Sequence, residues 1–152
     1  MVAPVDHITV QWTGAKELAA QLAGLARATA DHLAYRATYG ASHNVRNAAI
    51  ENIVARGLVE SGALVGNVAV ARIAPKGLVF SYDIGVRHGA IKQIHEDDDP
   101  YYWFMLEFGT VKRPVGTPYL TPAIENNKEA SLNIMQEVLT RGIASVVAKG
   151  GR

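Results

Sequence analysis

The sequence predicts an α+β domain in which a small, mostly antiparallel sheet packs against a long N-terminal helical region and a C-terminal helix. Three observations predict this class. Apolar residues recur at helical spacing over roughly residues 14–57 and again after residue 121, and two β-rich stretches joined by a short turn lie between them. The chain has 152 residues, which suits one domain, so we treat residues 1–152 as a single unit.

The segment "DHITVQW" near the N-terminus predicts a strand, because Ile8, Val10 and Trp12 alternate with polar residues. Thr13 then stands where a helix N-cap is expected, and a leucine-rich stripe follows it at spacings of three and four residues. The stripe resumes beyond Gly40, so we expect one kinked helix or two consecutive helices. Gly57 is the expected stop.

The next region predicts a β-hairpin. Its arms are "VGNVAVARIA" at 65–74 and "LVFSYDIGV" at 78–86, and the turn-like "PKG" separates them. Alternation in the second arm places one set of large apolar residues on a single face, which we expect to be core: Leu78, Phe80, Tyr82, Ile84 and Val86.

The C-terminal helix has a well-defined predicted start. Thr121 is expected to cap it, Pro122 to occupy its first position, and Glu125 to lie in its first turn. Its apolar stripe is expected to comprise Ile124, Leu132, Met135, Leu139, Ile143 and Val146 or Val147. Regular structure is weakest before it, in the polar excursion at 87–100 and the Pro- and Gly-containing segment at 111–122.

Composition excludes several classes of function. The net charge of +1 supplies no global field that would gather nucleic acid or anionic lipid. The chain has no cysteine, which excludes disulfides, cysteine-based zinc sites and thiol catalysis. The longest uncharged apolar window is about half of the ~20 residues that a membrane span needs, and we see no secretion signal.

Motifs for catalysis or cofactor binding are also missing from the sequence, which has no nucleophile elbow, zinc-protease motif, phosphate loop or dinucleotide fingerprint. We therefore expect no enzyme activity and no cofactor. The acidic run Glu96, Asp97, Asp98 and Asp99 follows His95, but it lacks the alternating ligands and the glycine of a calcium loop. We interpret it as a solvated loop whose like charges keep it extended, with a loop that faces a partner or a DNA channel as the alternative. A small metal-dependent hydrolase stays a remote alternative.

The stretch "YYWFMLEFGT" at 101–110 concentrates aromatic rings in a chain that is 7% aromatic. We expect its rings to be buried anchors, namely Tyr101, Tyr102, Trp103, Phe104 and Phe108. Phe108→Ala would then lower the stability of the protein. These rings are expected to hold a loop at a subunit contact, for which the candidates are Glu107, Gly109, Thr110, Lys112, Arg113, Pro118 and Tyr119. Gly109 would permit a backbone angle that other residues resist.

Four pieces of the sequence, in order, resemble one protein family. They are "GAKELAAQLAGLA" at 14–26, "SGAL" at 61–64, "YYWFMLEFGT" at 101–110 and "TPYLTPA" at 117–123. The last two are the most specific. The chain resembles the neck and tail-completion proteins of long-tailed bacteriophages, the gp-ten-like tail-component family related to minor tail protein Z. It departs from the family in lacking a proline shortly before "SGAL" and in having a long, acidic segment at 88–99.

This resemblance implies a structural protein of the virion, located in the neck or tail and in the host cytoplasm during assembly. It implies a closed homo-oligomeric ring, six-fold or twelve-fold, that completes the tail or joins it to the DNA-filled head. Its partners would be copies of itself, other neck and tail proteins, and the passing genome, bound without sequence specificity. No membrane would be among the partners. The alternative from the same region is a tail terminator or a head-closure protein.

Overall fold

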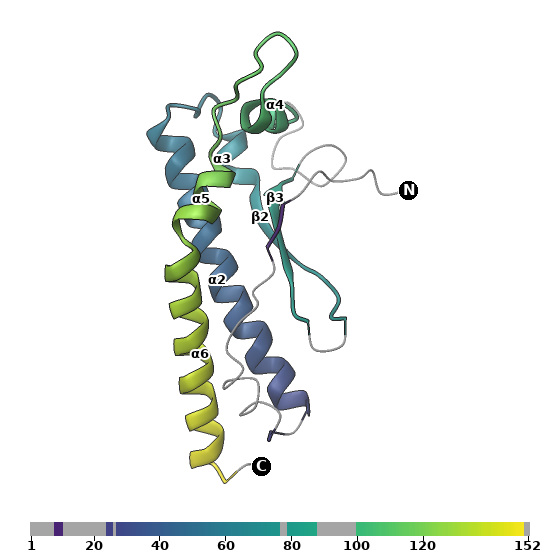
Figure 1. Cartoon of the computed structure of the whole chain (residues 1–152), viewed down its shortest axis with the longest axis vertical. Coiled ribbons are helices and arrows are strands. Elements are labelled where there is room, and N and C mark those ends of the chain that lie inside the picture. The colour runs from purple at the N-terminus through teal and green to yellow at the C-terminus, as the bar shows by residue number, and fades with distance from the viewer. Residues whose placement is uncertain (1–7, 11–23, 26, 77–78, 88–99, 151–152) are drawn as a thin grey trace.

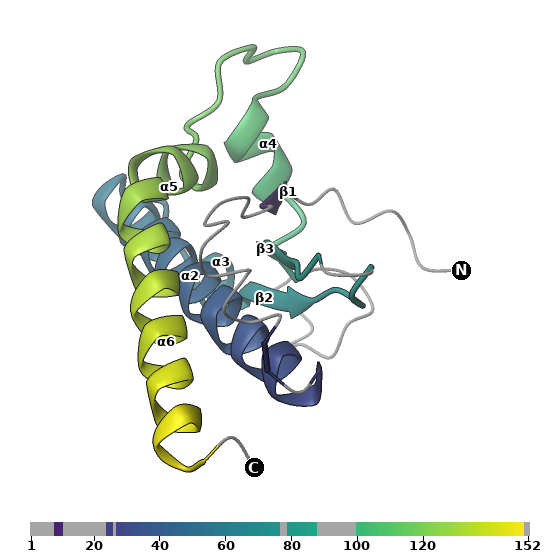
Figure 2. The same cartoon turned by 60° about the horizontal axis from the view of Figure 1, so that its bottom comes forward.

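The computed structural model describes residues 8–10, 24–25, 27–76, 79–87 and 100–150, and the protein has the predicted α+β fold. Helix α2 (Arg27–Ala55) lies in the middle, with helix α6 (Lys128–Ala148) along one side and a sheet on the other (Figures 1 and 2). The sheet is antiparallel and has the order β1-β3-β2, formed by Ile8–Val10, Tyr82–Val86 and Val68–Arg72. The central helix therefore contributes to two packing interfaces.

Helix α2 runs through Gly40 without interruption, so the expected kink or break at that glycine is wrong. The glycine serves close packing instead, because a Cβ there would lie 3.1 Å from Cγ2 of Ile134 on α6. Gly24 and Leu25 form a turn and a bend, so α2 begins at Arg27 rather than continuing from residue 14. The predicted cap Thr13 and the stretch 14–23 lie outside the described residues.

Helix α2 ends where the sequence predicts, with Gly57 as its stop. Gly57 has a φ of 67°, its N–H donates to the carbonyl of Val54, and the N–H of Leu58 donates to the carbonyl of Ile53. These two hydrogen bonds form a Schellman motif, which satisfies carbonyls that would otherwise lack partners at the helix end.

The predicted hairpin is present but begins later than expected. Residues 65–67 belong to a short helix, α3 (Ala63–Asn67), and β2 then pairs with β3 from Val68↔Val86 to Arg72↔Tyr82. The predicted core face of the second arm is confirmed for Tyr82, Ile84 and Val86, which are buried. Phe80 is half-buried, and Leu78 lies outside the described residues. The first strand is confirmed over Ile8–Val10.

The C-terminal helical region consists of two helices, α5 (Leu120–Asn126) and α6, which meet at Asn127. The apolar stripe of α6 faces α2 through buried Leu139 and half-buried Met135, Ile143 and Val146. Leu132 was wrongly placed on that stripe, because its side chain is exposed, and of the alternatives Val146 and Val147 it is Val146 that packs against the cluster.

The main core lies at the α4 end of the molecule, where α2, the sheet and α5 meet helix α4 (Trp103–Phe108). It contains two aromatic side chains, and its buried members are Val45, Ala49, Ile53, Leu64, Val68, Ile84, Val86, Trp103, Tyr119, Leu120 and Ala123. A second cluster lies between α2 and α6 around Leu33, Ala37 and Leu139. Both "SGAL" and "TPYLTPA" contribute residues to the main core.

Candidate functional site

Glu107 at the end of α4 caps helix α5. Its carboxylate accepts hydrogen bonds from the backbone N–H groups of Tyr119 (2.8 Å), Leu120 (2.9 Å) and Thr121 (2.7 Å). The first N–H groups of a helix have no partner within the helix, and they carry partial positive charge that an anion stabilises. A side chain from another element therefore performs the capping that the sequence assigns to Thr121.

The expected start of the C-terminal helix is corrected accordingly. Thr121 is the second residue of α5 rather than its cap, and Pro122 is the third rather than the first. Proline is tolerated there because the N–H that it lacks would have had no partner within the helix. Local sequence predicts a cap from adjacent residues, and it carries no signal for a carboxylate 14 residues away.

The loop between α4 and α5 is held to α4 and to α2 near its C-terminal end. The N–H of Thr117 donates to the carbonyl of Leu106 at 2.7 Å, and the side-chain amide of Asn52 on α2 donates to the carbonyl of Tyr119 at 2.9 Å. Two glycines allow the chain to pack this closely. A Cβ at Gly109 would lie 2.6 Å from the carbonyl oxygen of Arg113, and one at Gly116 would lie 2.6 Å from that of Leu106.

The predicted special backbone angle of Gly109 is confirmed, since its φ is 85°. At the tip of the loop, Thr110 and Arg113 exchange two backbone hydrogen bonds of 2.7 and 3.0 Å around Val111 and Lys112. The hydroxyl of Thr110 also accepts from the N–H of Arg113 at 3.0 Å. This short turn presents its two central side chains to solvent on a braced support.

The five predicted aromatic anchors do not share one environment. Trp103 is 2% exposed and belongs to the core, and Tyr102 is half-buried. Phe104 and Phe108 are 40% and 48% exposed, with ring centroids 4.7 Å apart, and Tyr101 is still more exposed, so these three are not buried anchors. The reason is helical spacing: Trp103 and Glu107 face the core, and the phenylalanines, also four residues apart, lie together on the outer side.

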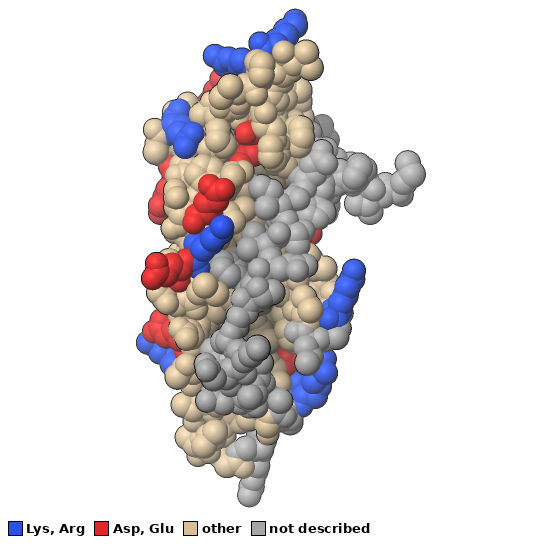
Figure 3. Space-filling model, in the orientation of Figure 1, with Lys and Arg blue, Asp and Glu red and all other residues tan. Residues whose placement is uncertain are grey.

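The outer side of α4 and the adjoining loop form one exposed surface, which we call the α4 surface. Its apolar members are Tyr101, Phe104, Met105, Phe108, Val111 and Val115, and its cations are Lys112 and Arg113. Within the described residues no carboxylate forms an ion pair with either cation. The loop lies at one end of the molecule, and lysine and arginine side chains stand there in Figure 3.

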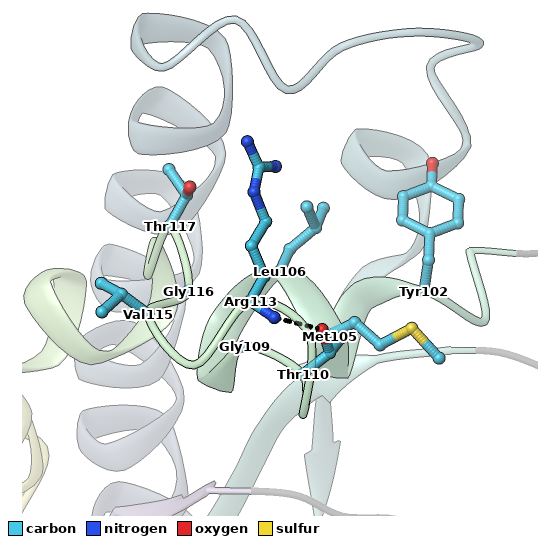
Figure 4. Close-up of a pocket in the computed structure, with 9 residues that line it drawn as sticks. All are labelled: Tyr102, Met105, Leu106, Gly109, Thr110, Arg113, Val115, Gly116 and Thr117. Carbon is cyan, nitrogen blue, oxygen red and sulfur yellow. Dashed lines mark hydrogen bonds between the residues drawn. The ribbon is translucent and has the colours of Figure 1, made fainter.

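A cavity of about 320 Å³ opens between α4 and the loop of residues 109–117 (Figure 4). Met105, Leu106 and Val115 give it apolar walls, and Arg113 and Thr117 supply polar groups. This lining suits an apolar side chain that has a negative group beside it. Sequence reasoning missed Met105, Val111 and Val115, although an apolar residue beside paired cations is a signal for a contact surface.

The structure gives two predicted interface residues a different role. Glu107 is 4% exposed and Tyr119 is fully buried, so neither offers a surface to another subunit, and both instead fix the loop from inside. The other candidates lie together on the loop: Thr110, Lys112 and Arg113 are exposed, and Gly109 and Pro118 are half-buried.

The acidic run at 96–99 and His95 lie outside the described residues. In the part of the chain that is described, no three histidine, aspartate or glutamate side chains gather where they could hold a metal ion. None of the helices described here is both long and apolar enough to cross a membrane. No family model, curated protein or solved structure matches the chain.

Proposed function

We propose that this chain is a structural subunit of a long-tailed bacteriophage virion, located in the neck, where it forms a ring that completes the tail or joins it to the filled head. The observation that carries the proposal is the α4 surface. Aromatic and aliphatic side chains that remain exposed beside two cations are typical of protein contact surfaces.

The bracing beneath the α4 surface supports the same proposal. The two most specific pieces of the family resemblance are joined physically, because Glu107 of "YYWFMLEFGT" binds the backbone of "TPYLTPA". A loop that is already ordered loses less conformational entropy on binding than a free one, which favours assembly. Catalysis is not part of the proposal, and the partners are other copies of the chain and neighbouring neck proteins.

The decisive experiment is a reconstruction of intact particles produced from the genome that encodes the chain. We expect a ring of this fold between the head and the tail tube. Complete, infectious particles that lack the chain would contradict the proposal, and its location at the tail end of the neck or at the head vertex would separate tail completion from head closure.

A charge-reversed variant supplies the matched test of the surface. Lys112→Glu with Arg113→Glu is expected to leave folding intact and to give heads and tails that do not join. Lys128→Glu with Lys149→Glu makes the same change in net charge at two exposed lysines elsewhere, and it is expected to assemble normally.

A further inference from the structure

The chain carries a second exposed apolar surface, at the end of α2. Val54 and Val59 are exposed there, and so are Glu51, which precedes them in the chain, and Glu60, which follows them. Neither glutamate forms an ion pair within the described residues. The α4 surface combines apolar side chains with cations, and this surface, which we call the α2-end surface, combines them with acids. The two are complementary in charge, with Arg56 as the one cation in the second.

Val59 is held in position to act as a projecting group. The Schellman hydrogen bond from Leu58 to Ile53 fixes the chain just before it, and Leu58 packs against the core. The hydroxyl of Ser61 accepts from the N–H of Ala63 just after it, at 3.3 Å. Val59 itself remains 46% exposed, and Glu60 follows it directly.

The two surfaces occupy compatible places in the molecule. The end of α2 and helix α4 lie at the same end of the long axis, with the end of α2 on the left and α4 on the right in both Figure 1 and Figure 2. Rotation about a ring axis keeps every residue at the same height along that axis, so surfaces that meet between neighbours must share a height. A ring whose axis follows α2 and α6 meets this condition.

We propose that the cavity between α4 and the loop binds a second copy of this chain, which inserts the side chain of Val59 and places the carboxylate of Glu60 against Arg113. The apolar walls suit the valine, and the guanidinium at the polar side suits the glutamate that follows it. Each subunit uses one surface of each kind, so the contact is heterologous and propagates around a ring. This inference rests on the proposed function and names the residues of its subunit contact.

A charge exchange tests the contact. Arg113→Glu and Glu60→Arg are each expected to weaken self-association at least ~10-fold, measured by analytical ultracentrifugation, because each brings two like charges together. The double variant R113E/E60R restores opposite charges, and it is expected to recover most of the wild-type affinity. A double variant as weak as either single variant would overturn the proposal.

The matched control is R113E combined with Glu129→Arg. Glu129 and exposed Leu132 form the rival acidic and apolar position on α6, one helical turn apart. We expect no recovery from this pair, and recovery here rather than with E60R would assign the cavity to α6 of the neighbour. Melting temperatures should stay close to the wild-type value, because all the substituted side chains are exposed.

The absence of cysteine allows a direct second test. Val59→Cys and Val115→Cys variants, carrying tags of different length, are mixed and oxidised. We expect the mixed disulfide to form in clear excess over either homodimer and over the product of Val115→Cys with Leu132→Cys. Failure to form it at concentrations that saturate self-association, or a chain that remains monomeric throughout, would overturn the contact.

These outcomes are separate from those of the proposed function. If the chain is found in the neck of the particle but gives neither the charge rescue nor the cross-link, the proposed function stands and the proposed contact is wrong. If the chain gives both results but is absent from particles, the proposed contact stands and the proposed function is wrong.

Discussion

The Oε1 atom of Glu107 on α4 lies 2.7 Å from the backbone nitrogen of Thr121 on α5. This hydrogen bond joins the two helices across the candidate contact loop. Replacing Glu107 by Ala leaves three buried or half-buried N–H groups without their acceptor. We expect a loss of about 2–4 kcal/mol in the free energy of unfolding, measured by denaturant titration. Glu107→Gln keeps one acceptor oxygen and should lose about half as much, whereas equal losses would contradict the capping role.

The two sides of α4 should respond differently to truncation. Trp103→Ala empties a core position and is expected to cost about 3–5 kcal/mol. Phe108→Ala, which sequence reasoning expected to destabilise the protein, should change thermal stability little because its ring is half exposed, and should instead weaken self-association. A large fall in melting temperature for Phe108→Ala would indicate instead that this ring belongs to the core.

The glycines that close the loop should not tolerate a side chain. Gly116→Ala places a Cβ against the carbonyls of Leu106 and Glu107, so we expect the loop to detach from α4. Hydrogen exchange at the N–H of Thr117, which bonds to Leu106, should accelerate strongly. Gly66→Ala is the control, because nothing lies within 4 Å of a Cβ there, and unchanged protection of Thr117 in both variants would refute the packing.

The close contact of α2 and α6 can be tested as a pair. A Cβ at Gly142 would overlap the side chain of Leu33, so Gly142→Ala is expected to cost about 1–3 kcal/mol. Leu33→Ala should cost more, about 2–5 kcal/mol, because it leaves a cavity in the second core cluster. The double variant should cost less than the sum, because the new methyl group fills part of that cavity, and simple additivity would mean that the residues do not touch.

Tyr119 should make the protein sensitive to alkaline pH. Burial, with a further contribution from the charge of Glu107, raises the pKa of its hydroxyl above the ordinary value of 10.0. The unfolded chain therefore releases this proton first, and the free energy of unfolding falls as pH rises above about 10. Tyr119→Phe should be less sensitive over that range, and an identical pH profile would contradict the assignment.

The same substitution has an expected effect at neutral pH. The Tyr119 hydroxyl is buried and has no hydrogen-bond partner within the described residues. Removing an unsatisfied buried group should leave stability unchanged or raise it by about 1 kcal/mol. Denaturant titration of Tyr119→Phe beside the wild type measures this difference, and a clear loss of stability would contradict an unsatisfied hydroxyl.

Periodicity predicted the parts of this fold in which residues close in sequence determine the structure. The stripe of α2, the αL stop at Gly57 and the alternation of β3 depend on local geometry, and each was readable without a structure. The prediction of a break at Gly40 failed because glycine weakens a helix locally, whereas here contact with α6 stabilises the helix and uses the missing side chain.

The sequence by itself determined the α+β class, the hairpin and the presence of an irregular segment between "EFGT" and "TPYLTPA". Only the tertiary structure decided which rings are buried, that Glu107 is an internal cap and that the α4 and α2-end surfaces lie at one end of the molecule. The physical reason is the sequence separation over which each interaction acts. Helical and strand periods act over a few residues, whereas capping by a distant carboxylate and the choice of an outer helix face depend on what packs alongside.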